Sequence, residues 1–303
     1  MSTHIPVLLH EVVEVLNPLP GKTYLDATID GGGHSREILK RMKGSGVLLG
    51  IDRDCDLLEE TDKFFHQLGF SNARLVCGNF SDLDSIARAS GVQAADGILF
   101  DLGFSSYHLE QSGRGFSFLR DEMLDMRYNP NDAVPTAAGI INTLPEHALA
   151  KLFQEYGEER FARRIARAVG EARAQKQIST TRELTNIIVR ALPRYPGSRR
   201  IHPATRVFQA LRMSVNNELE HCSEALRHGL NLLAPSGKMA AITFHSLEDR
   251  LVKNLFKQWQ TQGEAEVLTK KPIRPSSHEI HQNPRARSAK LRAIQKVGIS
   301  AEL

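Results

Sequence analysis

The sequence is poor in cysteine and contains no long apolar run. Its three cysteines, Cys55, Cys77 and Cys222, are scattered, and no two of them form a C-x-x-C pair. We therefore expect neither a disulfide framework nor a zinc site, and a reducing, cytoplasmic setting fits this usage best. No stretch is long and apolar enough to cross a bilayer, so we expect no membrane association. Residues 1–15 lack the basic segment and following apolar segment that a secretory signal requires.

A strong excess of charge of either sign is also missing, because the formal net charge is only +4 over 303 residues. The charge is nevertheless unevenly distributed, since residues 250–303 hold eleven lysines and arginines but four aspartates and glutamates. A basic end on a nearly neutral body is typical of a protein that binds an anionic partner such as RNA. It is equally compatible with a solvated, solubilising tail, and charge alone does not separate the two.

Apolar, strand-like segments alternate with helix-like segments in the first third of the chain. The expected strands are residues 23–29, 46–52, 73–77 and 97–101, and the expected helices are residues 35–43, 55–68 and 80–89. Continuous apolar strands separated by helices indicate a parallel sheet that is covered on both faces. The pattern therefore predicts a doubly wound α/β fold.

This alternation stops after residue 101. Residues 107–201 contain no strand candidate, and their clearest pattern is an amphipathic helix over 156–173 with arginines on one face. The alternation resumes with helices over 204–219 and 220–233 and a buried strand over 238–244.

The simplest architecture is one α/β domain that is interrupted by an all-helical domain. The expected boundaries are residues 1–106 and 202–303 for the α/β domain, and 107–201 for a helical substrate-recognition domain. Residues 266–270 and 289–297 are expected to add two antiparallel edge strands.

The strongest local signal is the segment DATIDGGGHS, in which a strand runs into Gly31, Gly32 and Gly33 and then into a helix. Glycines at this place let the backbone turn tightly and approach a ligand. Asp52 ends the next strand, where a carboxylate can accept both hydroxyls of a ribose. A dinucleotide pyrophosphate lacks its usual cradle, because Arg36 stands where G-x-G-x-x-G has its third glycine. A cofactor with a ribose but no phosphate, such as S-adenosylmethionine, therefore fits better than a dinucleotide. The alternative without a ligand is a tight turn with a helix-capping acid, and Asp52 at the end of the next strand favours the cofactor.

Further candidates follow the third, fourth and fifth strands. Asn79 and Phe80 would lie beside an adenine, although Phe80 could instead pack the following helix. Asp101 and Ser105 could accept hydrogen bonds from an exocyclic amine, since ligands of such sheets bind at the carboxyl ends of the strands. Ser105 could equally cap the next segment. His245 stands beside two acids and an arginine at the end of the fifth strand, which makes it a catalytic candidate of open role.

Three groups of side chains are candidates for gripping RNA. The helix over 156–173 offers exposed arginines, the helix over 204–219 has a polar stripe at i, i+3 and i+7, and a compact basic cluster lies near the end of the chain. These residues are Arg163, Arg167, Gln209, Arg212, Asn216, Arg285, Arg287 and Lys290.

Long segments in one order carry a resemblance to a known family. They are HIPVLLHEV, DATIDGGGHS, GIDRD, DGILFDLGFSS, RGFSF, LDMR, YGEERFARRIARA, HPATRVFQALR, FHSLEDR and NPRARSAKLR, and they extend from His4 to Arg292. In these segments the chain resembles the ribosomal RNA small subunit methyltransferase H family, also called the MraW family.

The resemblance implies a class I S-adenosylmethionine-dependent methyltransferase fold, Rossmann-like, with an inserted helical domain. It also implies methyl transfer from S-adenosylmethionine to the N4 amine of a cytosine in the decoding region of 16S rRNA, in the small ribosomal subunit. The family's cofactor contacts correspond to Gly32, Gly33, His34, Asp52, Phe80 and Asp101. His108 stands where the family usually has a glutamine contact, and Asp30 stands where it usually has glycine.

The expected chemistry is direct in-line transfer, with Asp101 as the main catalytic candidate and with no metal or covalent nucleophile. One alternative is an NAD-type oxidoreductase on the same fold, against which the missing third glycine argues. Another is a catalytically weak RNA-binding or ribosome-assembly protein, against which the glycine loop, Asp52 and Asp101 argue. A methyltransferase that acts on protein or DNA is a third alternative.

Overall fold

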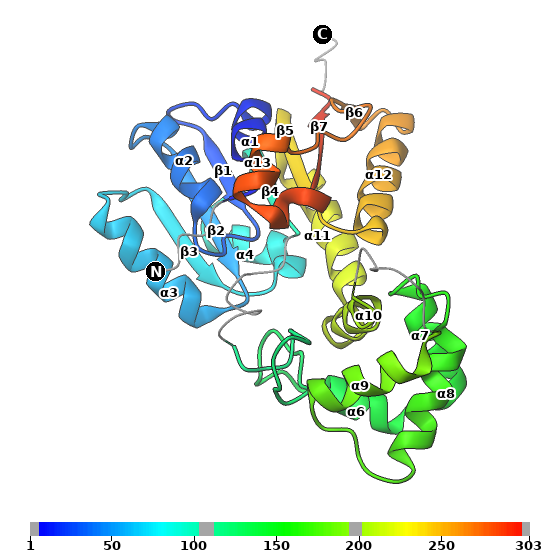
Figure 1. Cartoon of the computed structure of the whole chain (residues 1–303). Helices are drawn as coiled ribbons and strands as arrows, with labels where there is room; N and C mark the ends of the chain where they lie inside the picture. Colours follow the sequence, from blue (N-terminus) through cyan, green and yellow to red (C-terminus); the bar gives the residue numbers. More distant parts are fainter. Residues whose placement is uncertain (1–5, 103–111, 194–201, 299–303) are drawn as a thin grey trace. The chain divides into compact units, whose positions relative to one another are not determined.

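The computed structural model describes residues 6–102, 112–193 and 202–298 (Figure 1). The chain divides into two compact units, residues 1–103 with 219–303 and residues 104–218. The expected boundary at 106/107 lies outside the described residues. The second boundary lies at 218/219 rather than at the expected 201/202, because helix α10 (Thr205–Asn216) packs its apolar side chains into the core of the second unit.

The first unit is built on a seven-stranded sheet in the order β3-β2-β1-β4-β5-β7-β6. The strands are β1 (Thr23–Asp26), β2 (Val47–Asp52), β3 (Ala73–Cys77), β4 (Ala95–Asp101), β5 (Leu233–Thr243), β6 (Ala265–Val267) and β7 (Lys290–Lys296). Strands β1 to β5 pair in parallel, and β7 is antiparallel to both β5 and β6. The predicted α/β sheet is therefore confirmed, and the two strands expected near the end of the chain are present as β6 and β7, although only β6 lies at the edge of the sheet.

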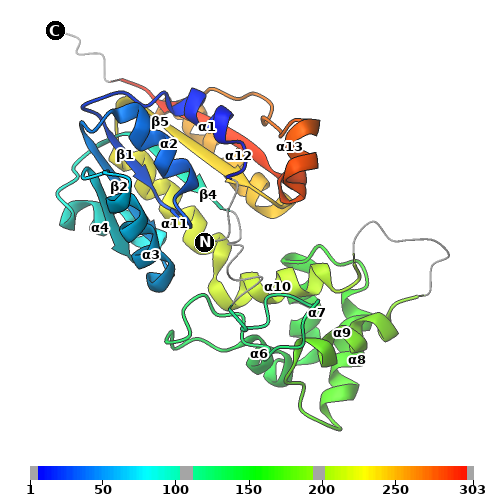
Figure 2. The ribbon, with the colours of Figure 1, turned by 60° about the vertical axis from the view of Figure 1, so that its left-hand side comes forward.

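Helices cover both faces of this sheet (Figures 1 and 2). The helices of the first unit are α1 (Leu9–Leu16), α2 (Gly33–Met42), α3 (Cys55–Gln67), α4 (Leu83–Ala89), α11 (Glu218–Leu232), α12 (Ser246–Thr261) and α13 (Ser277–Gln282), with the 3-10 turns Phe80–Asp82 and Pro284–Ser288. Helices α1, α2 and α3 share one core with Leu99, whereas α4, α11 and α12 share another with Ile98 and Phe100. Neighbouring residues of β4 thus point to opposite faces, as the pleat of a strand requires.

The second unit is helical apart from one isolated bridge in its described part. Its helices are α6 (Ala137–Thr143), α7 (Glu146–Glu155), α8 (Ala162–Arg173), α9 (Thr181–Ala191) and α10. The predicted apolar stripe of α10, with Phe208, Leu211 and Val215, packs into this unit's core. Helix α9 begins with a capping box between Thr180 and Glu183.

The expectation that the cysteines form no pair is wrong. Cys55, at the start of α3, and Cys77, at the end of β3, form a disulfide across 22 residues of sequence. Sequence spacing did not reveal this pair because parallel pairing of β2 with β3 brings the two positions together. Cys222 lies outside the disulfide and is buried in α11.

None of the helices in the described part of the chain combines the length and the apolar character that a membrane crossing requires.

Candidate functional site

The strand order reverses between β1 and β4, and ligands of open α/β sheets bind at such a switch point. Strand β1 leads outward to β2 and β3, whereas β4 leads the other way to β5. Because these strands are parallel, their carboxyl ends meet at one edge of the sheet. Four carboxylates lie at or just beyond these ends, those of Asp26, Asp30, Asp52 and Asp101.

Hydrogen bonds join the loops at this edge into one structure. The backbone N–H of Asp30 donates to Asp52 Oδ2 over 2.8 Å, which connects the glycine turn to the end of β2. The backbone N–H of Asp101 donates to Thr28 Oγ1 over 2.6 Å, which connects the end of β4 to the same turn. Thr28 was not among the predicted site residues, although it lies inside the DATIDGGGHS segment.

The glycine turn after β1 is needed for packing as well as for conformation. Gly32 caps α2 with a φ of 71°, and a Cβ at this position would lie 2.6 Å from the ring of Phe65 and 2.9 Å from the Thr61 methyl. Gly33 lies close to Pro6, since a Cβ there would approach the proline ring to 3.0 Å. Gly31, by contrast, is exposed. These close contacts are with side chains of the protein itself, so the approach of a ligand to the glycine turn stays a prediction.

Asp52 is the best-defined acceptor of the site. Its Oδ1 accepts the backbone N–H of Asp54 over 2.9 Å, and its Oδ2 accepts that of Asp30. Burial raises the pKa of the Asp52 carboxyl to about 7, and repulsion by the carboxylates of Asp30 and Asp54 also raises it. The two hydrogen bonds lower this pKa, but by less. A carboxylate at this position can accept two hydroxyl groups of a ribose.

A buried polar cluster, which was not predicted from the sequence, joins the residues on either side of the glycine turn. Asp26 is 1% exposed and accepts the Ser35 hydroxyl over 2.6 Å and the Thr28 N–H over 3.2 Å. Burial raises the pKa of the Asp26 carboxyl, and the hydrogen bond from Ser35 opposes this rise. The only signal in the sequence was that Asp26 and Ser35 open and close the DATIDGGGHS segment.

His34 is held between α1 and β4. Its Nε2 lies 2.9 Å from the Val7 carbonyl oxygen, so this nitrogen carries a hydrogen, because a carbonyl only accepts. Its Nδ1 lies 3.7 Å from Asp101 Oδ2. The ring is 5% exposed, and a protonated His34 would stabilise the Asp101 carboxylate.

Asn79 and Phe80 follow β3 at the same edge. The Asn79 Oδ1 accepts the Ser81 N–H over 3.2 Å, and its Nδ2 lies 3.5 Å from His221 Nδ1. Phe80 is half-buried and packs against the core of the first unit. Both residues thus have structural roles, and their contact with an adenine stays a prediction.

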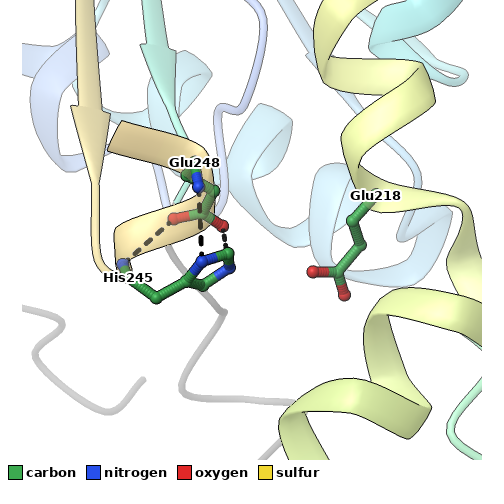
Figure 3. Close-up of side chains that lie close together, drawn as sticks. All are labelled: Glu218, His245 and Glu248. Carbon is green, nitrogen blue, oxygen red and sulfur yellow. Dashed lines mark hydrogen bonds and ion pairs between the residues drawn. The ribbon is translucent and has the colours of Figure 1, made fainter. Parts of the chain in front are cut away.

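His245 has a structural role at the end of β5 (Figure 3). It is the N-cap of α12, with Nδ1 accepting the Glu248 N–H over 3.4 Å, while Glu248 Oε2 accepts the N–H groups of Phe244 and His245. The His245 Nε2 lies 2.8 Å from Glu248 Oε1. This capping box accounts for Nδ1, whereas the buried Nε2 makes no hydrogen bond among the described residues, and the catalytic role of His245 stays a prediction. Glu218, also drawn in Figure 3, belongs to the second unit, where it pairs with Arg212.

Ser105 and His108, the remaining candidates of the catalytic and cofactor sets, lie outside the described residues.

The arginines of α8 lie on the surface of the second unit. Arg163 and Arg167 are exposed, and Arg167 pairs with Glu171 over 2.9 Å. Arg163 also lines a pocket of about 600 Å³ with Arg160 and Arg164. Glu158 and Glu159 line the same pocket, so its charge is mixed, and RNA contact by these arginines stays a prediction.

The polar stripe of α10 is used inside the second unit. Gln209 donates to the Tyr156 carbonyl over 3.2 Å, and Arg212 donates twice to Glu218, over 2.7 and 2.9 Å. Asn216 is 4% exposed, accepts the Tyr128 N–H and donates to the Met126 carbonyl. The Asn216 contacts hold the loop before α6, and any RNA contact by this stripe stays a prediction.

The basic cluster near the end of the chain divides into two parts. Arg285 and Arg287 are exposed on the Pro284–Ser288 turn. Lys290 instead donates to Asp249 Oδ2 over 2.7 Å, beside Arg292, which donates to Oδ1 over 2.7 Å. Although burial raises it, the pKa of the Asp249 carboxyl is held below its ordinary value by these two cations.

Comparison with known proteins gives one family across nearly the whole chain. The model of the MraW methylase family matches residues 1–297. Proteins called ribosomal RNA small subunit methyltransferase H are similar to the chain, and each comparison covers 97% of it. The one from Syntrophotalea carbinolica is 45% identical over 98% of its own length, that from Geobacter sulfurreducens 45% over 99%, and that from Dictyoglomus thermophilum 46% over 97%.

Proposed function

Because the chain belongs to the MraW methylase family, we propose that it methylates the RNA of the small ribosomal subunit with S-adenosylmethionine as donor. The acceptor is the N4 amine of a cytosine in the decoding region of 16S rRNA. The relatives' names support the RNA, and the observation in the structure that supports the cofactor is the cluster of carboxylates at the switch point of the sheet. The proposed location is the cytoplasm, where ribosomal subunits are available.

The acidic edge fits S-adenosylmethionine better than a dinucleotide. Asp101 places negative charge where the sulfonium group of the cofactor would bind, and opposite charges attract. The pyrophosphate of a nicotinamide dinucleotide would be repelled by this carboxylate and by that of Asp30 in the glycine turn. This electrostatic argument adds to the missing third glycine against an oxidoreductase.

The described residues would hold the cofactor along the strand ends. Asp52 would accept the ribose hydroxyls, the turn over Gly31, Gly32 and Gly33 would contact the amino-acid part, and Phe80 would stack on the adenine. When bound, the cofactor supplies an electrophilic methyl group. His34 would position the Asp101 carboxylate through its Nδ1, which lies 3.7 Å from Asp101 Oδ2.

Asp101 would act on the cytosine amine. The lone pair of this amine is delocalised into the ring, and a hydrogen bond from its N–H to the Asp101 carboxylate would localise it for attack. The same carboxylate would take up the proton that the methylated amine releases. The Asp101 side chain is 14% exposed, which leaves its carboxylate accessible at the edge.

RNA would be gripped by basic side chains of both units, with Arg163 and Arg167 on α8 and with Arg285 and Arg287 near the end of the chain. The target base would have to leave its stack to reach the sheet edge, as it does in other enzymes that modify bases. A ribosome-assembly protein without catalysis would need the RNA-binding surfaces, but it would not need the cluster of carboxylates at the edge of the sheet.

The test uses small ribosomal subunits from cells that lack the protein. They are incubated with the pure protein and isotope-labelled S-adenosylmethionine, and the nucleosides of the digested RNA are identified by mass spectrometry. We expect labelled N4-methylcytidine with the wild type, and a rate at least ~100-fold lower with Asp101→Ala. Undiminished turnover of Asp101→Ala would remove its catalytic role, and unlabelled RNA despite cofactor binding would contradict the proposed substrate.

A further inference from the structure

The Cys55–Cys77 disulfide lies on the surface of the first unit. Both residues are exposed, and their Cα atoms are 5.2 Å apart, within the range that a disulfide bridges without backbone movement. Small thiols and disulfides in solution therefore have access to this pair. Cys222, by contrast, is 2% exposed.

The disulfide also adjoins the acceptor that would hold the cofactor ribose. Cys77 is the partner of Asp52 in the register between β2 and β3, and the next N–H, that of Gly78, donates to the Asp52 carbonyl over 2.8 Å. Cys55 follows Asp54, whose N–H donates to the Asp52 carboxylate. The bond thus connects the turn that follows Asp52 to the end of the neighbouring strand β3.

We propose that Cys55 and Cys77 are a reversible redox-modification site that adjusts cofactor binding, an inference that rests on the proposed function. The oxidant is a small disulfide such as glutathione disulfide. The thiolate of one cysteine attacks it and releases one thiol, leaving a mixed disulfide. The thiolate of the other cysteine then attacks the bound protein sulfur and releases the second thiol, so that two protein thiols are oxidised while one small disulfide is reduced to two thiols.

Oxidation restrains the segment that positions Asp52. Without the disulfide, the turn from Asp52 into α3 is held by hydrogen bonds, including the cap from Leu57 N–H to Asp54 Oδ1 over 3.2 Å, and by the packing of Leu58 and Phe65 in the core. With it, the start of α3 is fixed to the end of β3. A site that is ordered before binding loses less conformational freedom when the ligand arrives, so the oxidised protein binds the cofactor more tightly.

The test compares the full chain after equilibration with glutathione disulfide and after reduction with a phosphine reductant. Peptide mapping without reduction reports the disulfide, and calorimetric titration with S-adenosylhomocysteine reports the affinity. We expect a linked Cys55–Cys77 peptide only in the oxidised sample, and a dissociation constant about threefold lower than in the reduced sample. The reduced wild type should recover its tighter binding on reoxidation.

Three variants separate the pair from other effects of oxidation. Cys55→Ser and Cys77→Ser should each bind with one affinity under both conditions, close to that of the reduced wild type, with circular dichroism confirming that they fold. Cys222→Ala should keep the full response of the wild type.

Two results would overturn the inference while leaving the proposed function intact: no linked peptide after oxidation, or equal and measurable affinities in the two states. A linked peptide in a protein that binds no S-adenosylhomocysteine in either state would contradict the proposed cofactor, and with it the effect on binding.

Discussion

At the scale of the residue, Asp30 combines a rare backbone conformation with an unfavourable charge. Its φ is 45°, in the left-handed region that favours glycine. Its carboxylate also raises the pKa of the Asp52 carboxyl. The position therefore bears on both stability and the ionisation of the site.

We predict that Asp30→Gly stabilises the protein and tightens cofactor binding at pH 6.5. Relief of the left-handed conformation contributes on the order of 1 kcal/mol, and loss of the charge lowers the pKa of Asp52, so that more of it is ionised. Thermal unfolding and calorimetric titration measure the two effects. Asp30→Asn is the matched control, because it removes the charge but keeps a side chain. Equal binding by Asp30→Asn and the wild type would show that the charge is immaterial.

The raised pKa of Asp52 predicts how stability depends on pH. The folded protein holds this proton up to about pH 7, whereas a free aspartate loses it near 3.8. The contribution of Asp52 is therefore fully present below pH 3.8 and is lost as the pH rises to 7, by at most ~1.4 kcal/mol per pH unit.

Asp52→Asn carries no charge at any pH and should escape this loss. Urea unfolding at pH 5 and pH 7.5 measures the stability of the variant relative to the wild type, and we expect this difference to shift in favour of the variant at pH 7.5. A constant cost of the substitution cancels between the two pH values. A difference that does not change with pH would mean that the folded Asp52 titrates normally.

At the scale of the element, the start of α12 has a polar motif that was predicted as chemistry and observed as a cap. FHSLEDR contains a histidine, two acids and an arginine, which is a reasonable catalytic pattern on sequence alone. In the structure His245 and Glu248 satisfy each other's backbone N–H groups. Sequence could not decide between the two because capping and catalysis use the same residue types at the ends of strands and helices.

The N-cap role of His245 predicts that two substitutions differ in their effect on stability. His245→Ala should destabilise the protein by about 1 kcal/mol, because the first turn of α12 loses its acceptor, whereas His245→Asn should preserve stability, since asparagine is a strong N-cap. Chemical denaturation measures both. If the alanine variant were as stable as the wild type, the cap would contribute nothing. Loss of turnover in the stable asparagine variant would restore the catalytic hypothesis.

At the scale of the whole molecule, the chain places candidate RNA contacts on two separate units. Arg163 and Arg167 belong to the second unit, and Arg285 and Arg287 to the first. Phosphate contacts make RNA affinity depend on salt, because each one releases bound counterions. Substitutions in one unit at a time therefore show, through the change in salt dependence, how many phosphate contacts that unit makes.

We predict that the pair Arg163→Gln and Arg167→Gln weakens binding to small-subunit RNA and lowers the slope of log affinity against log salt by about 1 to 2. Filter binding across a salt series measures this slope. Lys63→Gln is the control, because it removes an exposed cation from α3, which carries none of the candidate RNA contacts. A slope unchanged by the arginine pair would exclude α8 from the RNA interface.

The sequence by itself determined the α/β sheet with its helical insertion, the glycine turn and the position of Asp52 at the end of β2. These features follow from apolar periodicity and from glycine, which act locally and can be read along the chain. Only the tertiary structure decided that Asp26 bonds Ser35, that Cys55 meets Cys77, and that the polar stripe of α10 faces its own unit. Such pairings depend on which distant segments pack together, and periodicity marks a face of a helix or strand without saying what covers it.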